Sequence, residues 1–276
     1  MRKRQPGAIL LEILLVLFAL VFLYPIFLIC INSVKPFSEI MTHLFSLPRK
    51  LAPENYSTAW TIINYPRLFL NNLIITVVGT TGIIAVSSLA AYKLSRTKSK
   101  YSWTIFIFCI TPTIIPFQTT MITLLKLAQT MRLADSVLGL AVQYWGFGAP
   151  FAIFIYHGFV KTIPRELDES AIVDGATPFT AFLRVIFPLL KSVTSTIIVL
   201  DIMWIWNDFL LPLIMVNGSK ATRTLTLAVY SFFGQYNTNW QYAIASLVLA
   251  AFPSIIYFLI MQKYIVKGVT AGAVKG

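Results

Sequence analysis

Residues 161–191 read KTIPRELDESAIVDGATPFTAFLRVIFPLLK and form a polar segment between two long apolar runs. Pro164 suits the first turn of a helix, because its missing N–H would have no partner there. Three carboxylates follow within about one turn, where the positive end of the helix dipole favours negative charge. The pattern therefore predicts a first helix over residues 164–174. The three carboxylates belong to Glu166, Asp168 and Glu169.

A glycine and a proline mark the start of a second helix in the same segment. Gly175 can adopt the left-handed conformation that ends a helix. Thr177 can cap the next helix, and Pro178 suits its first position. Four apolar residues then recur at helical spacing, which predicts one packed face, and Pro188 is expected to end or kink this helix. The four are Phe182, Val185, Ile186 and Leu189. A helix-turn-helix outside the lipid is the expected result.

The rest of the chain has the composition of a membrane protein. Of its 276 residues, 57% are hydrophobic and only 12% are charged, which is too little polar surface for a water-soluble globule of this size. Six apolar stretches are long enough to cross a hydrocarbon core of about 30 Å, which takes about 20 helical residues. Approximately, they cover residues 10–34, 68–92, 102–125, 137–160, 193–216 and 242–262. The sequence predicts an all-α membrane protein with six transmembrane helices in one domain, residues 1–276.

Prolines and basic residues refine this prediction. Pro25 in the first stretch, and Pro112 and Pro116 in the third, predict bent helices. Fourteen of the 22 Lys and Arg residues fall on one side of the predicted spans, so the positive-inside rule places both termini and the polar segment in the cytoplasm. The fourteen are Arg2, Lys3, Arg4, Lys93, Arg96, Lys98, Lys100, Lys161, Arg165, Arg184, Lys191, Lys263, Lys267 and Lys275.

Three other interpretations fit the sequence less well: nucleic-acid binding, a secretory signal peptide and a role for the cysteines. The net charge of +12 is explained by topology and contact with anionic lipid better than by nucleic-acid binding. The first apolar run is longer than a secretory signal peptide and lacks a convincing cleavage site, so we expect it to remain as a helix. Cys30 and Cys109 lie in predicted spans and are expected to be packing residues.

Three short motifs in the polar segment resemble the cytoplasmic signature of the permease subunits of binding-protein-dependent ABC importers. That signature is Glu-Ala-Ala, a glycine four residues on, and an Ile-x-Leu-Pro-like ending. Ser170 here replaces the first alanine and Phe187 the usual leucine, which are mild departures. The fuller pattern is similar to the carbohydrate branch, and especially to its maltose-type second permease subunit. The motifs are Glu169-Ser170-Ala171, Asp174-Gly175-Ala176 and Ile186-Phe187-Pro188, accompanied by Pro164, Leu167, Pro178 and Phe182.

This resemblance implies the type I importer permease fold, in which residues 161–191 form a coupling loop. Because ATP is hydrolysed on a separate subunit, the membrane part needs a rigid projection that converts a rigid-body rotation into helix movement. Glu169 and Asp174 are expected to pair with basic groups on the ATPase or to cap backbone amides, and Ala171 and Gly175 to permit close approach. The implied coupling residues are Glu166, Glu169, Ser170, Ala171, Asp174, Gly175, Ala176 and Pro178.

The C-terminal residues 262–276, QKYIVKGVTAGAVKG, carry a second resemblance. They are similar to the tail of the same subunit, which in the maltose system reaches into the interface of the ATPase pair. The resemblance implies that a cytoplasmic tail over residues 263–276 contacts the ATPase through Gly268, Gly272 and Lys275.

The fifth apolar stretch carries two carboxylates that are costly inside a membrane. Asp201, Trp204 and Asp208 follow a helical spacing of three and four residues, with Asn207 beside them. Asp201 lies roughly 15 Å beyond Lys191, near mid-bilayer, where a charged residue costs about 2.5 to 3.5 kcal/mol. Either a polar partner in the helix bundle or a water-filled solute path would offset this cost. A sugar suits the second alternative, because its hydroxyls can bond to carboxylates while its C–H face stacks on Trp204.

The fourth stretch offers a weaker pair of solute-path candidates. Tyr144 and Trp145 lie beside two glycines, Gly146 and Gly148. Aromatic and small residues in membrane helices more often serve packing, so packing and solute contact both stay open.

The chain carries no sign of catalysis. It has no G-x-x-x-x-G-K-[ST] phosphate loop, and His43 and His157 are isolated. We therefore expect a non-catalytic subunit without a cofactor or metal of its own, with ATP and magnesium held by the partner ATPase.

The resemblance implies import of a sugar or oligosaccharide across a bacterial cell membrane. The expected partners are a second, homologous permease, two ATPase subunits and an extracytoplasmic solute-binding protein. A permease of the same superfamily for another solute, such as glycerol phosphate or a polyol, is the main alternative. A secondary carrier acting alone, or a membrane-embedded enzyme, would leave the polar segment unexplained.

Overall fold

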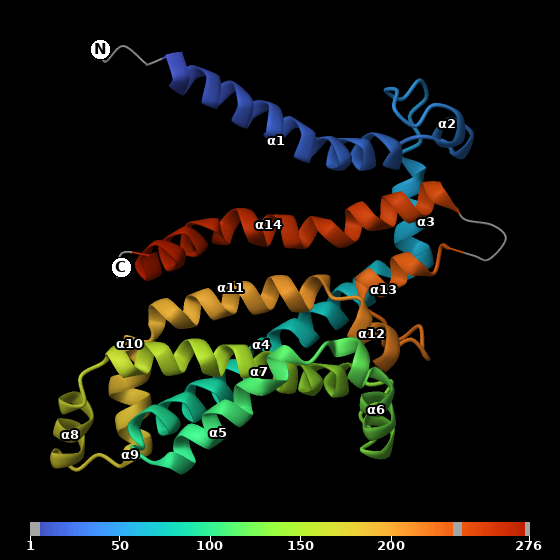
Figure 1. Ribbon diagram of the computed structural model, residues 1–276. Helices are drawn as coiled ribbons and strands as arrows, with labels where there is room; N and C mark the ends of the chain where they lie inside the picture. Colours follow the sequence, from blue (N-terminus) through green and yellow to red (C-terminus); the bar gives the residue numbers. More distant parts are fainter. Residues whose placement is uncertain (1–5, 234–238, 274–276) are drawn as a thin grey trace. The chain divides into compact units, whose positions relative to one another are not determined.

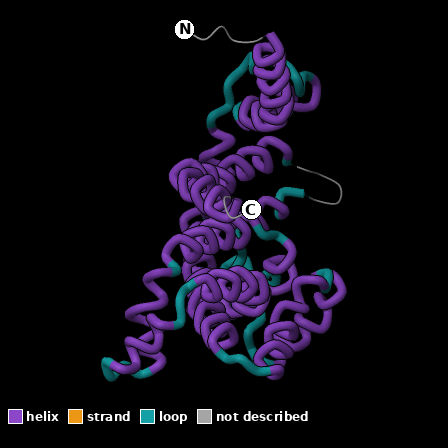
Figure 2. The backbone as a smooth tube through the Cα atoms, turned by 60° about the vertical axis from the view of Figure 1, so that its left-hand side comes forward, coloured by secondary structure: helices purple, strands orange, loops and turns teal. Residues whose placement is uncertain are grey.

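The computed structural model describes residues 6–233 and 239–273, which fold into helices joined by short loops (Figures 1 and 2). The helices are α1 (Pro6–Ser33), α2 (Phe37–Thr42), α3 (Glu54–Ile63), α4 (Tyr65–Arg96), α5 (Lys100–Ile110), η1 (Thr111–Ile114), α6 (Phe117–Thr130), α7 (Val137–Thr162), α8 (Glu166–Val173), α9 (Pro178–Ala181), η2 (Phe182–Ile186), α10 (Phe187–Leu189), α11 (Lys191–Asn207), α12 (Leu210–Met215), α13 (Leu225–Tyr230) and α14 (Trp240–Ala273).

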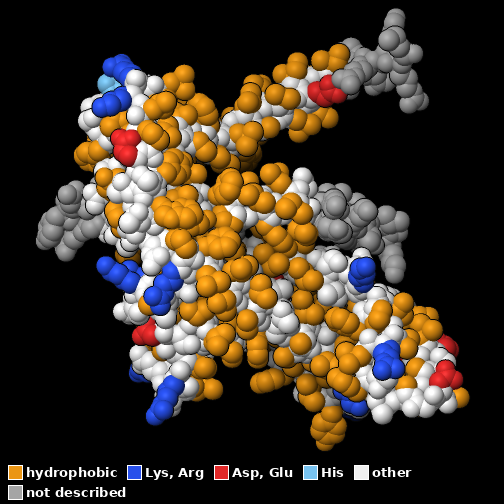
Figure 3. All heavy atoms as spheres, turned by 180° about the vertical axis from the view of Figure 1, so that it is seen from behind, with side chains coloured by type: hydrophobic (Ala, Val, Ile, Leu, Met, Phe, Trp, Pro, Cys, Tyr) orange, Lys and Arg blue, Asp and Glu red, His pale blue; other side chains and the backbone are white. Residues whose placement is uncertain are grey.

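Four of these helices are long and apolar enough to cross a membrane by themselves. They contain the predicted first, second, fourth and sixth spans and cover Ile9–Ser33, Tyr65–Arg96, Val137–Thr162 and Trp240–Gln262. Two bent helix pairs bring the total to six if each pair is one span. Hydrophobic side chains cover much of the surface visible in Figure 3, including α1. The prediction of an all-α, multi-pass membrane fold is confirmed.

The sequence predicted one bent helix for the third span, but the structure has two helices there. Helix α5 ends at Ile110, a short 3₁₀ turn follows, and α6 leaves at an angle of 104° to it. Pro112 and Pro116 explain the break, because neither can donate the N–H that a continuous helix needs. The expected kink over residues 102–125 is therefore a sharp corner.

The fifth predicted span, residues 193–216, is also interrupted. Helix α11 ends at Asn207, and Asp208 takes an extended conformation with ψ of 141°. The Asp208 Oδ1 atom accepts a hydrogen bond from the Leu210 N–H, at 3.1 Å, at the start of α12. Aspartate side chains compete in this way with helical backbone hydrogen bonds. Asp208 consequently lies outside the α11 face that the spacing assigned to it.

The contacts of the chain group into two compact units. The first comprises residues 1–65 and 228–252, and the second comprises residues 66–227 and 253–276. The prediction of a single domain stays a prediction, and each unit is described by itself.

In the first unit, the loop after α1 is held by two buried charged residues. Lys35 is fully buried, and its ammonium donates to the carbonyls of His43 and Ser46 at 2.9 and 2.6 Å. Burial lowers the pKa of Lys35. The Glu39 carboxylate accepts hydrogen bonds from the backbone N–H groups of Arg49 and Lys50, at 2.7 and 3.3 Å. The hydrogen bond from Arg49 is the largest cause of the lowered pKa of Glu39.

The second unit contains a continuous hydrophobic core between α4, α5, α7, η2 and α11. Close helix approach depends on glycine in two places. A Cβ atom at Gly82 of α4 would lie 1.9 Å from the Trp145 ring of α7, and one at Gly148 would lie 2.3 Å from Ile83. Small residues allow membrane helices to approach in this way. The largest fully buried core side chains include Tyr144, Tyr156, Phe182, Ile83 and Leu140.

Candidate functional site

The polar segment forms the predicted helix-turn-helix, with α8 and α9 lying beyond the ends of α7 and α11 (Figure 1). Helix α8 begins at Glu166, two residues after Pro164, and ends at Val173. Gly175 has φ of +86°, as its predicted left-handed role requires. The Gly175 N–H donates to the Ile172 carbonyl, and the Ala176 N–H donates to the Ala171 carbonyl. This pair of hydrogen bonds is a Schellman motif, which closes the end of α8.

Helix α9 begins as the sequence predicted. The Thr177 side chain accepts a hydrogen bond from the Thr180 N–H at 3.2 Å, and Pro178 occupies the first helical position. A π turn, η2, then carries the chain to α10, with the Phe187 N–H donating to the Phe182 carbonyl. The π turn accommodates Pro188, which cannot donate to the carbonyl four residues earlier.

The π turn changes which apolar side chains face the core. Phe182 and Ile186 are buried as predicted, but Leu189 is exposed and Leu190 is buried in its place. The prediction for Leu189 is wrong because the extra residue in the π turn rotates the following residues around the helix axis. The segment then bends by 77° into α11.

A buried ion pair fastens α8 to the end of α4. The Asp168 carboxylate lies 2.8 Å from the Arg96 guanidinium and accepts a hydrogen bond from the Tyr92 hydroxyl at 2.6 Å. Arg96 also donates to the Val160 and Ile163 carbonyls at the end of α7, at 3.3 and 3.1 Å. Arg96 therefore connects three elements: α4, the end of α7 and α8.

Two further contacts strengthen this connection. Arg165, just before α8, donates to the Ser95 carbonyl of α4 at 3.3 Å. The Tyr92 ring packs on Phe182 of η2, with centroids 5.0 Å apart. Sequence reasoning assigned Asp168 only to the helix dipole and Arg96 only to membrane topology. No local pattern reveals the pair, because 72 residues separate its members.

The opposite side of α8 is exposed and carries both apolar and acidic groups. Val173 is 85% exposed, and Ile172 and Phe179 are exposed as well. Among the predicted coupling residues, Ala171 is buried and Ala176 is half-buried, so both serve the fold of the segment. The exposed ones are Glu166, Glu169, Ser170, Asp174, Gly175 and Pro178.

Two of the three predicted tail residues lie in a helix that continues the last span. Gly268 and Gly272 lie within α14, which runs to Ala273 and not only to the predicted end of the span at residue 262. Lys275 lies outside the described residues.

Three of the six predicted solute-path residues, Tyr144, Trp145 and Asp208, form hydrogen bonds to other elements of the fold. Tyr144 is fully buried and donates its hydroxyl to the Asp208 carboxylate at 2.8 Å. The backbone carbonyl of Asp208 also accepts from the Thr226 hydroxyl at 2.7 Å. Trp145 fills the space beside Gly82 and donates its indole N–H to the Val78 carbonyl at 3.0 Å.

Asp201 differs from these three residues because its carboxylate lacks such a partner among residues 6–233 and 239–273. Its side chain is only 5% exposed, and its Oδ2 atom has no hydrogen-bond partner within the described residues. Trp204, one turn along α11, is 42% exposed, and its ring stands edge-on to Tyr144 with centroids 5.3 Å apart. Asn207 is exposed and donates to the Met203 carbonyl at 2.8 Å. A pocket of about 370 Å³ adjoins the carboxylate and is lined by Phe147, Gly148, Phe151, Leu200, Asp201 and Trp204.

The comparisons with known proteins agree with this fold and with the projecting segment. The family described as "Binding-protein-dependent transport system inner membrane component" matches residues 83–271, more than half of the chain. The chain belongs to this family of transport permeases, which confirms the resemblance seen in the polar segment.

Individual relatives cover at least nine-tenths of the chain. The chain is 40% identical, over 100% of both sequences, to the "Probable starch degradation products transport system permease protein AmyC" of Thermoanaerobacterium thermosulfurigenes. It is 32% identical to the "Multiple sugar-binding transport system permease protein MsmG" of Streptococcus mutans, over 95% of both. It is also 32% identical to the "Melibiose/raffinose/stachyose import permease protein MelC" of Bacillus subtilis, over 91% of both.

A solved structure supports the fold. It is described as a bacterial ABC transporter involved in the import of the acidic polysaccharide alginate. The match has a TM-score of 0.80 at 18% identity and covers 96% of this chain and 99% of the other. The chain therefore has the fold of an ABC importer subunit.

Proposed function

We propose that this chain is the permease subunit of an ATP-driven importer for a sugar or oligosaccharide. It would form half of the translocation path and dock onto an ATPase through residues 161–191, the coupling loop. The observation that carries the proposal is the construction of this loop. Its buried side is fixed to α4 by Asp168 and Arg96, while its outer side presents exposed apolar and acidic groups. The names of the relatives support a carbohydrate as the solute.

The outer side of the coupling loop suits a protein partner better than water. Exposed apolar side chains that occur together, as Ile172 and Val173 do at the end of α8, are normally buried in a contact. Glu169 and Asp174 flank them and would pair with basic groups at the rim of a groove on the ATPase. A groove of this kind would bury the apolar tip and orient α8.

The connections of Arg96 explain how movement would be transmitted. When the ATPase rotates, α8 would move with it, and the Asp168–Arg96 ion pair would pull the end of α4 along. Because Arg96 also bonds to the end of α7, two membrane-spanning helices would respond to one docking event. Coupling of this kind requires a rigid link, which the ion pair provides together with the hydrogen bond from Tyr92 to Asp168.

The full transporter would contain a second, homologous permease, two ATPase subunits that hold ATP and magnesium, and a solute-binding protein outside the membrane. This chain would itself be non-catalytic. Both of its termini and the coupling loop would lie in the cytoplasm, in keeping with the distribution of Lys and Arg. ATP-driven closure of the ATPases would open the cavity outward, and hydrolysis would return it inward.

The pocket beside Asp201 is the part of this chain that we expect to touch the solute. An unpaired carboxylate at mid-span can accept hydrogen bonds from sugar hydroxyls, and Trp204 offers an aromatic face for the C–H face of the ring. Asp208, Tyr144 and Trp145 are not needed for this role, because they already bond within the protein.

Docking can be tested by purifying the tagged chain from its native cell in mild detergent and identifying the attached proteins by mass spectrometry. Wild type is expected to bring an ATPase and a second permease. The double variant Glu169→Ala, Gly175→Pro is expected to lose the ATPase and keep the permease. Glu54→Ala, which changes an exposed carboxylate at the start of α3, is the control and should keep both. A wild-type chain that purifies alone would overturn the importer proposal.

The solute can be tested separately by uptake. Cells lacking the chain are expected to lose accumulation of an oligosaccharide from a panel of labelled sugars and polyols, and to regain it when the chain is restored. If accumulation of glycerol phosphate or a polyol changes instead, the chain is an importer permease for that solute. The docking result would stand in that case.

A further inference from the structure

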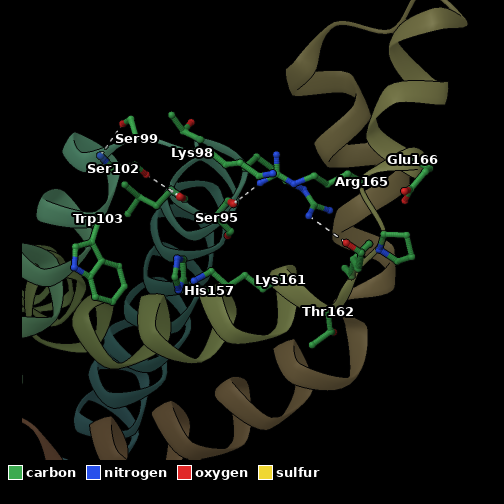
Figure 4. A pocket seen from close by; sticks show the side chains of 15 residues that line it. Ser95, Lys98, Ser99, Ser102, Trp103, His157, Lys161, Thr162, Arg165 and Glu166 are labelled. Carbon is green, nitrogen blue, oxygen red and sulfur yellow. Dashed lines mark hydrogen bonds between the residues drawn. The ribbon is translucent and has the colours of Figure 1, made fainter.

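A second pocket lies on the side of the second unit where α4 ends, and the proposed function does not use it. Its volume is about 540 Å³, and it is built from the end of α4, the α4–α5 loop, the start of α5, and the chain from the end of α7 into α8 (Figure 4). Its charged and aromatic lining includes Arg96, Lys98, Trp103, Lys161, Arg165 and Glu166.

The lining is strongly basic, and most of its positive charge is not neutralised. Arg96 is paired with Asp168. Lys98, Lys161 and Arg165 form no ion pair in the part of the chain that the structure describes. The Glu166 carboxylate lies on the other side of Arg165 from Lys161 and Trp103 (Figure 4). Three cations around one cavity create a field that favours an anion.

Aromatic and hydroxyl groups complete the pocket. The Lys161 ammonium lies 5.9 Å from the centre of the Trp103 ring. Trp103 is itself 56% exposed, so one wall of the pocket is an aromatic surface open to the surroundings. Ser99 and Ser102 are in the same wall, where the Ser99 side chain accepts from the Ser102 N–H at the start of α5.

The position of the pocket identifies the source of the anion. It lies where three membrane-crossing segments end, namely α4 at Arg96, α5 at Lys100 and α7 at Thr162. Tryptophan at such a position is typical of the headgroup level of a bilayer, and this side of the protein carries the excess of Lys and Arg. Basic pockets between membrane helices on that side suit anionic headgroups.

We propose that this pocket binds the phosphate of an anionic phospholipid headgroup. Lys98 and Lys161 would contact the phosphate, Arg165 would close the pocket from the α8 side, and Trp103 would pack against the glycerol region. A bound headgroup would bridge the α4–α5 loop to the entry of α8. Because Arg165 also holds Ser95 of α4, the lipid would stiffen the base of the coupling loop.

The test uses the full chain with the subunits that purify with it, and counts bound lipid by native mass spectrometry. The protein is titrated with phosphatidylglycerol, with phosphatidylcholine or with inorganic phosphate. Wild type is expected to bind phosphatidylglycerol and neither of the others at the same concentration. Lys98→Gln, Lys161→Gln should weaken this binding about 30-fold, because each basic group near an anionic headgroup contributes roughly a fivefold effect.

Two controls separate the pocket from general surface charge. Lys93→Gln, Lys191→Gln removes the same charge from exposed positions outside the pocket and should leave binding within about twofold of wild type. Lys98→Arg, Lys161→Arg keeps the charge and should restore binding. Equal weakening in both glutamine variants would overturn the proposal, and so would binding of inorganic phosphate without phosphatidylglycerol. Neither result bears on ATPase docking or on the transported solute.

Discussion

Two buried aspartates of the second unit differ in one respect. Asp168 at the base of the coupling loop is ion-paired with Arg96 and accepts a hydrogen bond from Tyr92, whereas the Asp201 carboxylate on α11 has no ion pair in the described residues, and its Oδ2 atom accepts no hydrogen bond there. A buried charge that is paired and hydrogen-bonded fixes structure, and one that is left unpaired is costly without adding stability. The difference indicates that Asp168 connects elements of the fold, while Asp201 is available for a ligand.

The largest effect is expected from breaking the Asp168 connection. Asp168→Ala leaves the Arg96 guanidinium buried without its partner, which should lower the free energy of unfolding by about 3 kcal/mol. The melting temperature of the purified chain measures this loss, and ATPase retention should fall with it. Glu169→Ala removes an exposed carboxylate next to it and should leave the melting temperature unchanged. Equal effects of the two substitutions would contradict the assignment.

A second variant separates lost pairing from lost packing. Asp168→Leu, Arg96→Leu removes both charges, and a buried ion pair replaced by apolar groups is often nearly neutral. The double variant should therefore melt closer to wild type than Asp168→Ala does, yet still couple poorly because the link to α4 is gone. A double variant that melts as low as Asp168→Ala would show that the ion pair is not the cause.

The next-largest effect concerns Asp208, whose carboxylate, like that of Asp168, accepts a hydrogen bond from a tyrosine hydroxyl. Tyr144→Phe removes the hydroxyl that donates to its carboxylate, and should cost about 2 kcal/mol of stability. Tyr156→Phe is the matched control, because the Tyr156 hydroxyl donates to a neutral group, Thr194. It should cost about 1 kcal/mol. Thermal denaturation of both variants gives the comparison, and a larger loss in Tyr156→Phe would count against the structural role of Asp208.

A smaller, pH-dependent effect is expected at Glu39 in the first unit. Its pKa is lowered, mainly by the hydrogen bond from the Arg49 N–H. The carboxylate therefore stabilises its loop at pH above its ordinary pKa of 4.5, and this contribution is lost as the pH falls through the lowered value. As the pH falls through that range, the Arg49 and Lys50 amides should lose protection in wild type, so that their hydrogen exchange slows less than base catalysis alone predicts. Glu39→Gln should abolish the dependence, and Glu54→Gln should retain it.

The smallest effect on stability is expected at Asp201, with a large effect on transport. Asp201→Asn removes a buried charge that has no ion-pair partner in the described residues, so no stabilising pair is lost and the free energy of unfolding should not fall. Uptake of the solute should nevertheless fall. A drop in melting temperature as large as that of Tyr144→Phe would show that Asp201 is structurally paired. Unchanged uptake and solute selectivity would remove Asp201 from the solute path.

Local signals in the sequence were enough to predict the coupling loop. Gly175, Thr177 and Pro178 each occupy the backbone position that their chemistry favours, so the order helix, turn, helix follows from neighbouring residues alone. The four continuous membrane-spanning helices were likewise predictable, because length and apolar composition decide them.

What the sequence did not reveal depends on contacts between distant residues or on helix irregularities. Pairing of Asp168 with Arg96 requires α4 and α8 to be adjacent, which no spacing encodes. The π turn before Pro188 moved Leu190 into the position expected for Leu189, and α11 ended just before Asp208, which accepts a hydrogen bond from the Leu210 N–H. In the last two cases the local sequence allows two backbone conformations, and tertiary packing selects one of them.

The most direct measurement places a photo-crosslinking amino acid at Val173, the exposed apolar tip of the coupling loop, and identifies what it captures in native membranes. Leu51, exposed in a loop of the first unit, carries the same label as a control. The account predicts that an ATPase subunit is captured from position 173 and not from position 51. Capture of no ATPase from position 173, in cells where uptake is intact, would contradict it.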